Sequence, residues 1–215
     1  MKTIARVTIP LVMLCILLGG IAAVAAAQSP SGKAAERDWF ALGQKKLDHD
    51  QHWMARAQSH INNLSARGVD TSRMQAVIDE ANSVVVAPMQ AALASHDVNA
   101  IRAALMLSMG NASRNSNWTT GHYYAKFVVE LDQAILNSIG PKAYEKGLGS
   151  LIPPIQASID SASYQLVVVG FTHYAPGQAE SIWNDIHSAS GGLRDLIGQL
   201  RNTAVRPMLT AVAAA

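Results

Sequence analysis

Apolar residues recur at helical spacing along most of the chain, beginning with a seven-residue repeat between residues 34 and 66. Two sets of positions share this repeat, the second three residues after the first: Phe40, Leu47, Met54 and Ile61, then Gly43, Asp50, Ala57 and Leu64. Heptad spacing is typical of a helix packed lengthwise against another helix. It predicts a long first helix that ends before Gly68. Asp50 then faces the apolar seam, and we expect it to pair with an Arg or Lys, to cap a neighbouring group or to lie where the seam is open.

Two further helices are predicted before residue 110. The second begins at Ser72, where Ser72 and Gln75 fit a capping box. Pro88 removes one backbone hydrogen bond within it, which predicts a kink near Val84. The third begins at Asp97, whose side chain can cap it. Its predicted core positions are Val98, Ile101, Leu105 and Met109.

The second half of the chain predicts three more helices after a polar loop at residues 110–121. One carries Phe127, Val128, Leu131, Ile135 and Ile139 and is expected to end at Gly140-Pro141. The next spans about 155–169 with core positions Ile155, Ile159, Ala162 and Leu166. Its end, 166–169, is apolar on all sides, and Asp160 is the one charge between Lys146 and Glu180. This helix is therefore predicted to be the most buried element of the bundle.

The last helix repeats apolar residues in steps of four and three: Ile182, Ile186, Ala189, Leu193, Leu196 and Leu200. Gly191-Gly192 interrupts this pattern at a cost of about 1 kcal/mol per glycine relative to alanine. The pair is therefore expected where packing compensates or where a neighbouring helix approaches closely. Pro207 is expected to stop the helix.

No stretch alternates convincingly over the length of a strand, so the fold class is all-α. We expect an antiparallel helical bundle of about five to six helices, formed by residues 34–207. A flexible leader at 28–33 precedes the bundle, and an apolar tail at 208–215 follows it.

The first 27 residues have the zones of a signal peptide. Lys2 and Arg6 precede an uncharged run, and Ala25-Ala26-Ala27 offers the small residues of a cleavage site. We expect cleavage after Ala27. The alternative is an uncleaved anchor, because the uncharged stretch 7–27 has about the length that spans a bilayer. Either form predicts an extracytoplasmic protein, secreted or held in the cell envelope.

The charge and cysteine content reduce the number of function classes to consider. Loss of Lys2 and Arg6 lowers Lys plus Arg from 17 to 15, equal to the 15 Asp plus Glu, so nothing suggests nucleic-acid binding. Charged residues are 15% of the chain, below the usual ~25%. Cys15, the one cysteine, lies in the leading segment, so a cleaved chain has no disulfide and no cysteine-ligated metal.

A resemblance covers roughly residues 35–110. A long helix ending in the run Ala66 to Ser72, a second amphipathic helix and a helix opening at His96-Asp97 follow the leader. This order resembles uncharacterised secreted α-helical proteins of methanogenic archaea. The resemblance implies the extracellular setting and the helical fold. It implies no activity and no functional residues.

A cluster of imidazole and carboxylate groups lies on the first predicted helix: Asp48, His49, His52 and His60. His49 and His52 are three residues apart, and Asp48 and His52 are four apart, so each pair can share a helix face. These ligands suit a divalent transition metal such as zinc, copper or nickel. The alternative is a solvated polar face. No other cofactor is expected.

A second constellation repeats near two helix starts. His122-Tyr123 follows Gly121, and His173-Tyr174 follows Thr172. If both starts lie at the same end of the bundle, these four side chains line a pocket for a small polar ligand. The alternative is two unrelated helix entries.

Three glycosylation sequons occur, at Asn63, Asn111 and Asn117, and the last two lie in the polar loop. Metalloprotease, serine-hydrolase, P-loop and haem-attachment motifs do not occur. We therefore expect a non-enzymatic bundle that acts by binding or scaffolding in the cell envelope. Its partner would be an envelope protein, a cell-surface component or a second copy of itself. The alternatives are a metal-binding bundle and a small-ligand or sensor domain.

Overall fold

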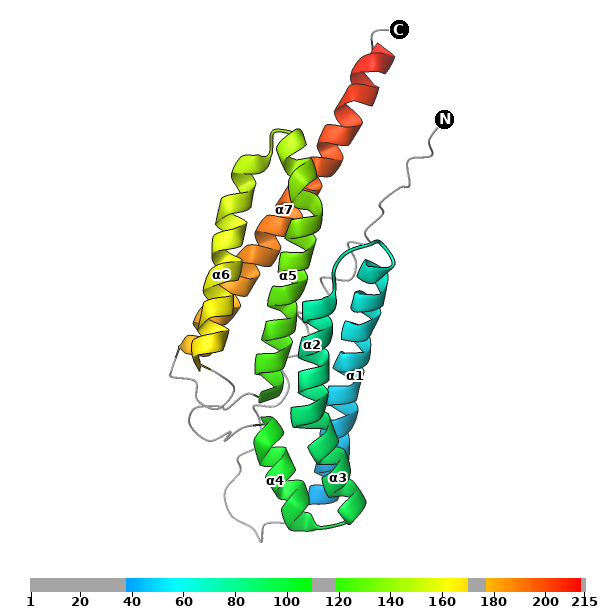
Figure 1. The fold of residues 1–215 in the computed structure, drawn as a ribbon, viewed down its shortest axis with the longest axis vertical. Coiled ribbons are helices and arrows are strands. Elements are labelled where there is room, and N and C mark those ends of the chain that lie inside the picture. Colours follow the sequence, from blue (N-terminus) through cyan, green and yellow to red (C-terminus); the bar gives the residue numbers. More distant parts are fainter. Residues whose placement is uncertain (1–37, 110–118, 170–176, 214–215) are drawn as a thin grey trace, which may run out of the picture. The chain divides into compact units, whose positions relative to one another are not determined.

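The computed structural model describes residues 38–109, 119–169 and 177–213. They belong to the compact unit Asp38–Ala215, and the following concerns that unit alone. The described residues form helices and connecting turns without a strand, which confirms the all-α prediction (Figure 1). The elements in chain order are α1 (Trp39–Ser65), α2 (Ser72–Ala81), the π-helical turn η2 (Asn82–Val86), α3 (Ala87–Ser95), α4 (Val98–Met109), α5 (Thr119–Glu145), the 3-10 turn η3 (Gly149–Leu151), α6 (Ile152–Val169) and α7 (Gln178–Ala213).

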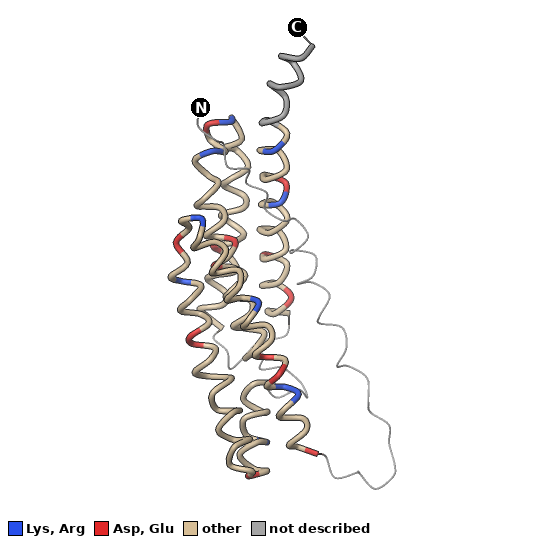
Figure 2. The backbone as a smooth tube through the Cα atoms, turned by 90° about the vertical axis from the view of Figure 1, so that its right-hand side faces the viewer, with Lys and Arg blue, Asp and Glu red and all other residues tan. Residues whose placement is uncertain are grey.

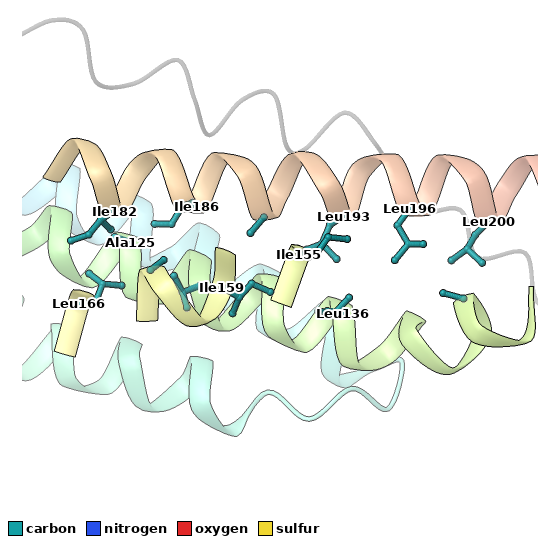
Figure 3. Close-up of a cluster of buried hydrophobic side chains, with 14 residues drawn as sticks. Ala125, Leu136, Ile155, Ile159, Leu166, Ile182, Ile186, Leu193, Leu196 and Leu200 are labelled. Carbon is teal, nitrogen blue, oxygen red and sulfur yellow. The ribbon is translucent and has the colours of Figure 1, made fainter. Parts of the chain in front are cut away.

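Helix α5 is shared by two groups of helices. One face of α5, from Ala125 to Ala143, packs with α6 and α7, and another face, from Tyr123 to Ala134, packs with α1 and α2. Helix α4 contacts α1, α3 and α5, and α1 also packs on α3. Three apolar cores result. One lies among α5, α6 and α7, one among α1, α2 and α5, and one among α1, α3 and α4. Figure 3 shows the first, where Leu193, Leu196 and Leu200 of α7 point toward the neighbouring helices.

The heptad seam of α1 is largely confirmed. Leu47, Ala57 and Ile61 are buried, and so are Gly43 and Asp50. Phe40, at the first turn, is 41% exposed and stacks on His96 with ring centroids 5.5 Å apart. Gly43 is needed because a Cβ there would lie 2.9 Å from Ile101 Cγ2 of α4. The absence of a side chain lets α1 and α4 approach closely.

The start of α2 differs from the predicted capping box. Ser72 is the first helical residue, and Thr71 before it makes no side-chain capping bond. Asp70 Oδ1 instead accepts a hydrogen bond from the Ser72 N–H at 3.0 Å, as in an Asx turn. Gln75 donates to Asp79 instead of reaching back to the helix start.

At the position of the kink predicted near Val84, the structure has the π-helical turn η2. A π turn interrupts regular i to i−4 hydrogen bonding, and this one directly precedes α3, which carries Pro88 at its start. Helices α2 and α3 therefore follow one another without a loop, with a local change of winding between them.

Helix α4 confirms its predicted cap. Asp97 Oδ1 accepts a hydrogen bond from the Asn99 N–H at 2.8 Å. Ile101 and Leu105 are buried, whereas Val98 is 51% exposed, so its assignment to the core is wrong. The side chain of Met109 lies outside the described residues.

Both prolines expected to end helices lie inside them. Helix α5 continues past Pro141 to Glu145. Gly140 lacks the Cβ that would clash with the proline ring, and the helix beyond Pro141 buries Ala143 completely. Gly147, with φ 73°, follows the end of the helix, and Leu148 N–H donates to Ala143 O at 2.8 Å. Helix α7 likewise runs through Pro207, since one proline removes a single helical hydrogen bond.

The prediction that the helix of about 155–169 is the most buried element of the bundle is wrong. Leu166 is buried, but Val167 and Val168 are 78% and 62% exposed. Helix α6 packs on α5 and α7 along the stripe Ile155, Ile159, Ala162 and Leu166. No described element covers its opposite face.

Candidate functional site

The first turns of α5 hold the largest concentration of buried polar side chains in the described chain. Thr119 and His122 are buried there. The hydroxyls of Thr119 and Thr120 donate to Leu107 O (2.5 Å) and Ser108 O (3.2 Å) at the end of α4. These bonds satisfy carbonyls that a helix end leaves unpaired, and they tie α4 to α5 across the undescribed segment 110–118.

Asp50 is buried in the seam, and of the three alternatives for it the structure confirms pairing with a cation. Lys46 Nζ pairs with both Asp50 oxygens and also donates to Thr120 Oγ1 at 2.9 Å. Burial lowers the pKa of Lys46 and raises that of Asp50, and the attraction between the two groups opposes both shifts. The pair joins α1 to α5 inside the fold.

A second polar cluster joins α5 to α2. Glu80 accepts hydrogen bonds from Tyr123 Oη at 3.2 Å and Lys126 Nζ at 2.7 Å. The bond from Lys126 lowers the pKa of Glu80, while burial is the main cause that raises the pKa of the completely buried Tyr123.

His122 is held in its neutral form. Burial is the main cause that lowers its pKa to about 4, with a smaller contribution from the charge of Lys126. Its ring lies edge-on to Tyr123, with centroids 5.6 Å apart. A buried neutral imidazole fits a structural role at this helix junction.

Aromatic rings link three helices beside these clusters. Trp53 of α1, Tyr124 of α5, and Trp183 and His187 of α7 form a row with successive centroid distances of 6.1, 5.8 and 6.0 Å. Burial raises the pKa of Tyr124 to about 12. The Trp53 indole N–H is buried without a hydrogen-bond partner in the described structure. The row brings α7 into contact with the junction of α1 and α5.

Asp132 is a second buried carboxyl, in the core among α5, α6 and α7. It is 2% exposed, and its Oδ2 accepts a hydrogen bond from Ser190 Oγ of α7 at 2.6 Å. Burial raises its pKa to about 7, and the bond from Ser190 partly opposes this shift. Its position relative to Val129 and Leu136, three and four residues away, places it on the core stripe of α5.

The residues of the predicted metal cluster do not converge. Asp48, His49 and His52 are exposed on α1, and His60 is half-buried, which lowers its pKa. Within the described ranges, no three His, Cys, Asp or Glu side chains are placed to hold one ion. Asp48 accepts a hydrogen bond from Gln44 at 2.9 Å. Metal binding by this cluster stays a prediction.

Two of the four residues of the predicted ligand pocket lie in the described part of the chain. His122 and Tyr123 are buried among the helices, whereas His173 and Tyr174 lie outside the described residues. The sequons Asn111 and Asn117 also lie outside them, and Asn63 is exposed on α1. The pocket and the use of the sequons stay predictions.

Sequence reasoning missed Lys46, Glu80 and Asp132. Lys46 could have been found as the cation four residues before the seam carboxylate Asp50. Asp132 could have been found from its heptad position between Val129 and Leu136. Glu80 carried no local signal, because its partners lie 43 and 46 residues away in the sequence.

The outer face of α6 exposes three large apolar side chains. Val167 and Tyr164 are the two most exposed large hydrophobic side chains in the described chain, at 78% and 70%, and Val168 lies beside them. Charges are sparse along the helices (Figure 2), and Asp160 is the one charged residue between Lys146 and Glu180. We name the exposed positions Pro153, Pro154, Ala157, Asp160, Ser161, Tyr164, Val167 and Val168 the outer α6 face.

Chemically, the buried clusters and the outer α6 face suit different tasks. The polar groups of the clusters bond mainly to one another across α1, α2, α4, α5 and α7, which stabilises the helix junctions. The outer α6 face presents apolar side chains to solvent, which is typical of a contact surface. No described helix has the length and apolar character required to cross a membrane.

Comparisons with known proteins add no relative. No family model matches the chain, and no match was found among curated proteins or among solved structures. The resemblance to archaeal secreted proteins therefore stays a prediction.

Proposed function

We propose that this protein is a non-enzymatic helical bundle that is exported and acts by binding or scaffolding in the cell envelope. One observation carries the proposal: the outer α6 face exposes Tyr164, Val167 and Val168 together, although α6 buries a complete apolar stripe on its other side. A surface of this kind gains free energy when a protein partner covers it, at about 25 cal/mol per Å² of apolar area.

The buried clusters support a rigid scaffold rather than a reaction centre. Lys46, Asp50 and Thr120 satisfy one another inside the fold, and Glu80 joins Tyr123 to Lys126. Such groups hold the helices in one arrangement, as a rigid contact surface requires.

Export is supported by the leader. Lys2 and Arg6, the uncharged run and Ala25-Ala26-Ala27 follow the order that signal peptidase substrates share. The mass of the protein recovered from cells tests this part of the proposal. We expect a chain that begins at Gln28, outside the cytoplasm. A cytoplasmic protein that keeps residues 1–27 would contradict export.

Cell fractionation tests the role of the outer α6 face. We expect the wild-type protein in the envelope fraction and Val167→Asp largely released from it, because a charge on the covered face opposes binding. Val98→Asp is the matched control, since Val98 is also exposed but lies on α4. Equal retention of all three proteins would contradict the proposal.

A further inference from the structure

The exposed positions of α6 follow their own heptad. Pro153, Ala157, Asp160, Tyr164 and Val167 are separated by steps of four, three, four and three, and all are exposed. The buried stripe of the same helix uses the same steps, beginning at Ile155. Helix α6 therefore carries two seams. One is filled by α5 and α7, and the other has the spacing of a helix that packs lengthwise against another helix.

The charges of the outer α6 face restrict what can cover it. The sequence has no Lys or Arg between Lys146 and Glu180, so this face offers no cation to an acidic protein or to anionic lipid. Its one charge, Asp160, is held in place, because Gln156 donates to its Oδ1 at 2.8 Å and is itself bonded to Gln133 of α5. The covering surface must be nearly uncharged and must offer a hydrogen-bond donor to Asp160.

A second copy of the same face meets both requirements. In an antiparallel pair of α6 helices with the two-fold axis level with residue 162, Asp160 lies opposite Tyr164 of the other copy, and Ala157 lies opposite Val167. The Tyr164 hydroxyl can then donate to the carboxylate of Asp160, and the two-fold symmetry makes this contact twice. The small side chain of Ala157 leaves room for Val167. We propose that two copies of this protein associate through their outer α6 faces in this register.

The size of the outer α6 face determines the affinity expected for the dimer. Helix α6 has 18 residues and is about 27 Å long, so one helix pair buries less than the ~800 Å² per partner of a standard interface. We therefore expect a weak dimer, with a dissociation constant on the order of 10–100 µM. A high local concentration of the protein in the cell envelope would populate this dimer.

The dimer inference rests on the proposed function for its cellular role, but its test does not. Sedimentation equilibrium of the protein, purified in the form that the cell produces, measures the dissociation constant of the dimer directly. We expect Val167→Asp to raise the dissociation constant at least about tenfold and Tyr164→Phe about fivefold, because Asp160 then loses its donor. Val98→Asp should leave it unchanged. Circular dichroism melts identify any variant that fails to fold.

A disulfide experiment tests the register. In a Cys15→Ser background, Ala157→Cys and Val167→Cys proteins, mixed and oxidised, should form a mixed disulfide. Ala157→Cys alone should stay uncoupled. The two copies of residue 157 would lie about 15 Å apart along the axis, beyond the ~7 Å limit on Cα separation. Coupling of Ala157→Cys with itself would indicate a parallel pair and overturn the proposed register.

The remaining outcomes separate the two proposals. A wild-type protein that stays monomeric at 1 mM, or a dimer that survives Val167→Asp, overturns the dimer. If the wild-type protein is monomeric but stays in the envelope fraction, and Val167→Asp is released from it, the proposed function stands with another partner. If it binds vesicles of zwitterionic lipid, and Val167→Asp abolishes that binding, the face is covered by lipid rather than by a second copy.

Discussion

Asp132 of α5 accepts a 2.6 Å hydrogen bond from the hydroxyl of Ser190 of α7, 58 positions later in the sequence, inside an otherwise apolar core. A carboxyl group in that setting is more easily kept protonated than ionised. The contact therefore links the packing of α5 and α7 to pH.

The first prediction concerns the pH dependence due to Asp132. Its pKa is about 7 in the folded protein and near 3.8 when unfolded. The folded state thus binds more protons between these values, and stability falls as pH rises through this window. The loss is at most about 4 kcal/mol. Denaturant unfolding of wild type and Asp132→Asn at pH 5 and pH 8 measures it. The free energy of unfolding of Asp132→Asn, relative to that of wild type, should be higher at pH 8 than at pH 5. The same relative value at both pH values would contradict the prediction.

The second prediction concerns His122, which acts in the opposite direction. Its pKa is about 4 when folded and 6.5 when unfolded. The unfolded state binds more protons in this window, so stability falls as pH drops from 6.5 through 4, by at most about 3 kcal/mol. Unfolding of His122→Gln at pH 4.5 and pH 7 should lack this loss.

Because the windows of His122 and Asp132 overlap, the wild-type profile between pH 4 and 6.5 should be flatter than that of either variant. The double variant Asp132→Asn/His122→Gln serves as the control, since it removes both titrations. If His122→Gln and wild type had the same dependence of unfolding free energy on pH between 4 and 6.5, the prediction for His122 would be wrong.

The third prediction tests the buried pair Lys46–Asp50. Lys46→Met leaves the carboxylate of Asp50, which is 1% exposed, without its cation. Loss of one partner of a buried pair costs about 3–5 kcal/mol, whereas apolar replacement of both is often neutral. The double variant Lys46→Met/Asp50→Leu should therefore be more stable than Lys46→Met alone, as measured by denaturant unfolding. Lys45→Met, at the exposed neighbouring position, should change stability by less than about 0.5 kcal/mol.

The fourth prediction separates the two adjacent glycines of α7. A Cβ at residue 192 would lie 2.7 Å from Ile155 Cγ1 of α6, whereas at residue 191 it would meet nothing within 4 Å. Gly192→Ala should lower the free energy of unfolding by about 1–3 kcal/mol through overpacking. Gly191→Ala should raise it by up to about 1 kcal/mol through helix propensity. Thermal melts of both variants test this, and equal stabilisation by both would show that α6 and α7 lie further apart.

The helices and their core faces could be predicted from the sequence to a large extent. The repeats beginning at Phe40 and Ile155 identified most buried positions of α1 and α6, although Phe40 itself is exposed. Asp97 identified the start of α4. These signals are local, because the repeat of the α-helix determines which residues of one segment lie on the same face. The same locality explains the errors at Pro141 and Pro207, where the sequence shows a helix breaker but not the interactions that sustain the helix beyond it.

The tertiary structure alone decided which faces are covered and how the polar groups pair. Asp50 required a partner by its position, but only the packed helices show that Lys46 and Thr120 supply it. Asp132 and Ser190 meet because α5 and α7 lie side by side, and the exposure of Val167 follows from which side of α6 those helices occupy. Contacts between residues far apart in sequence depend on how whole helices pack, and a local pattern of apolar and polar residues does not specify that arrangement.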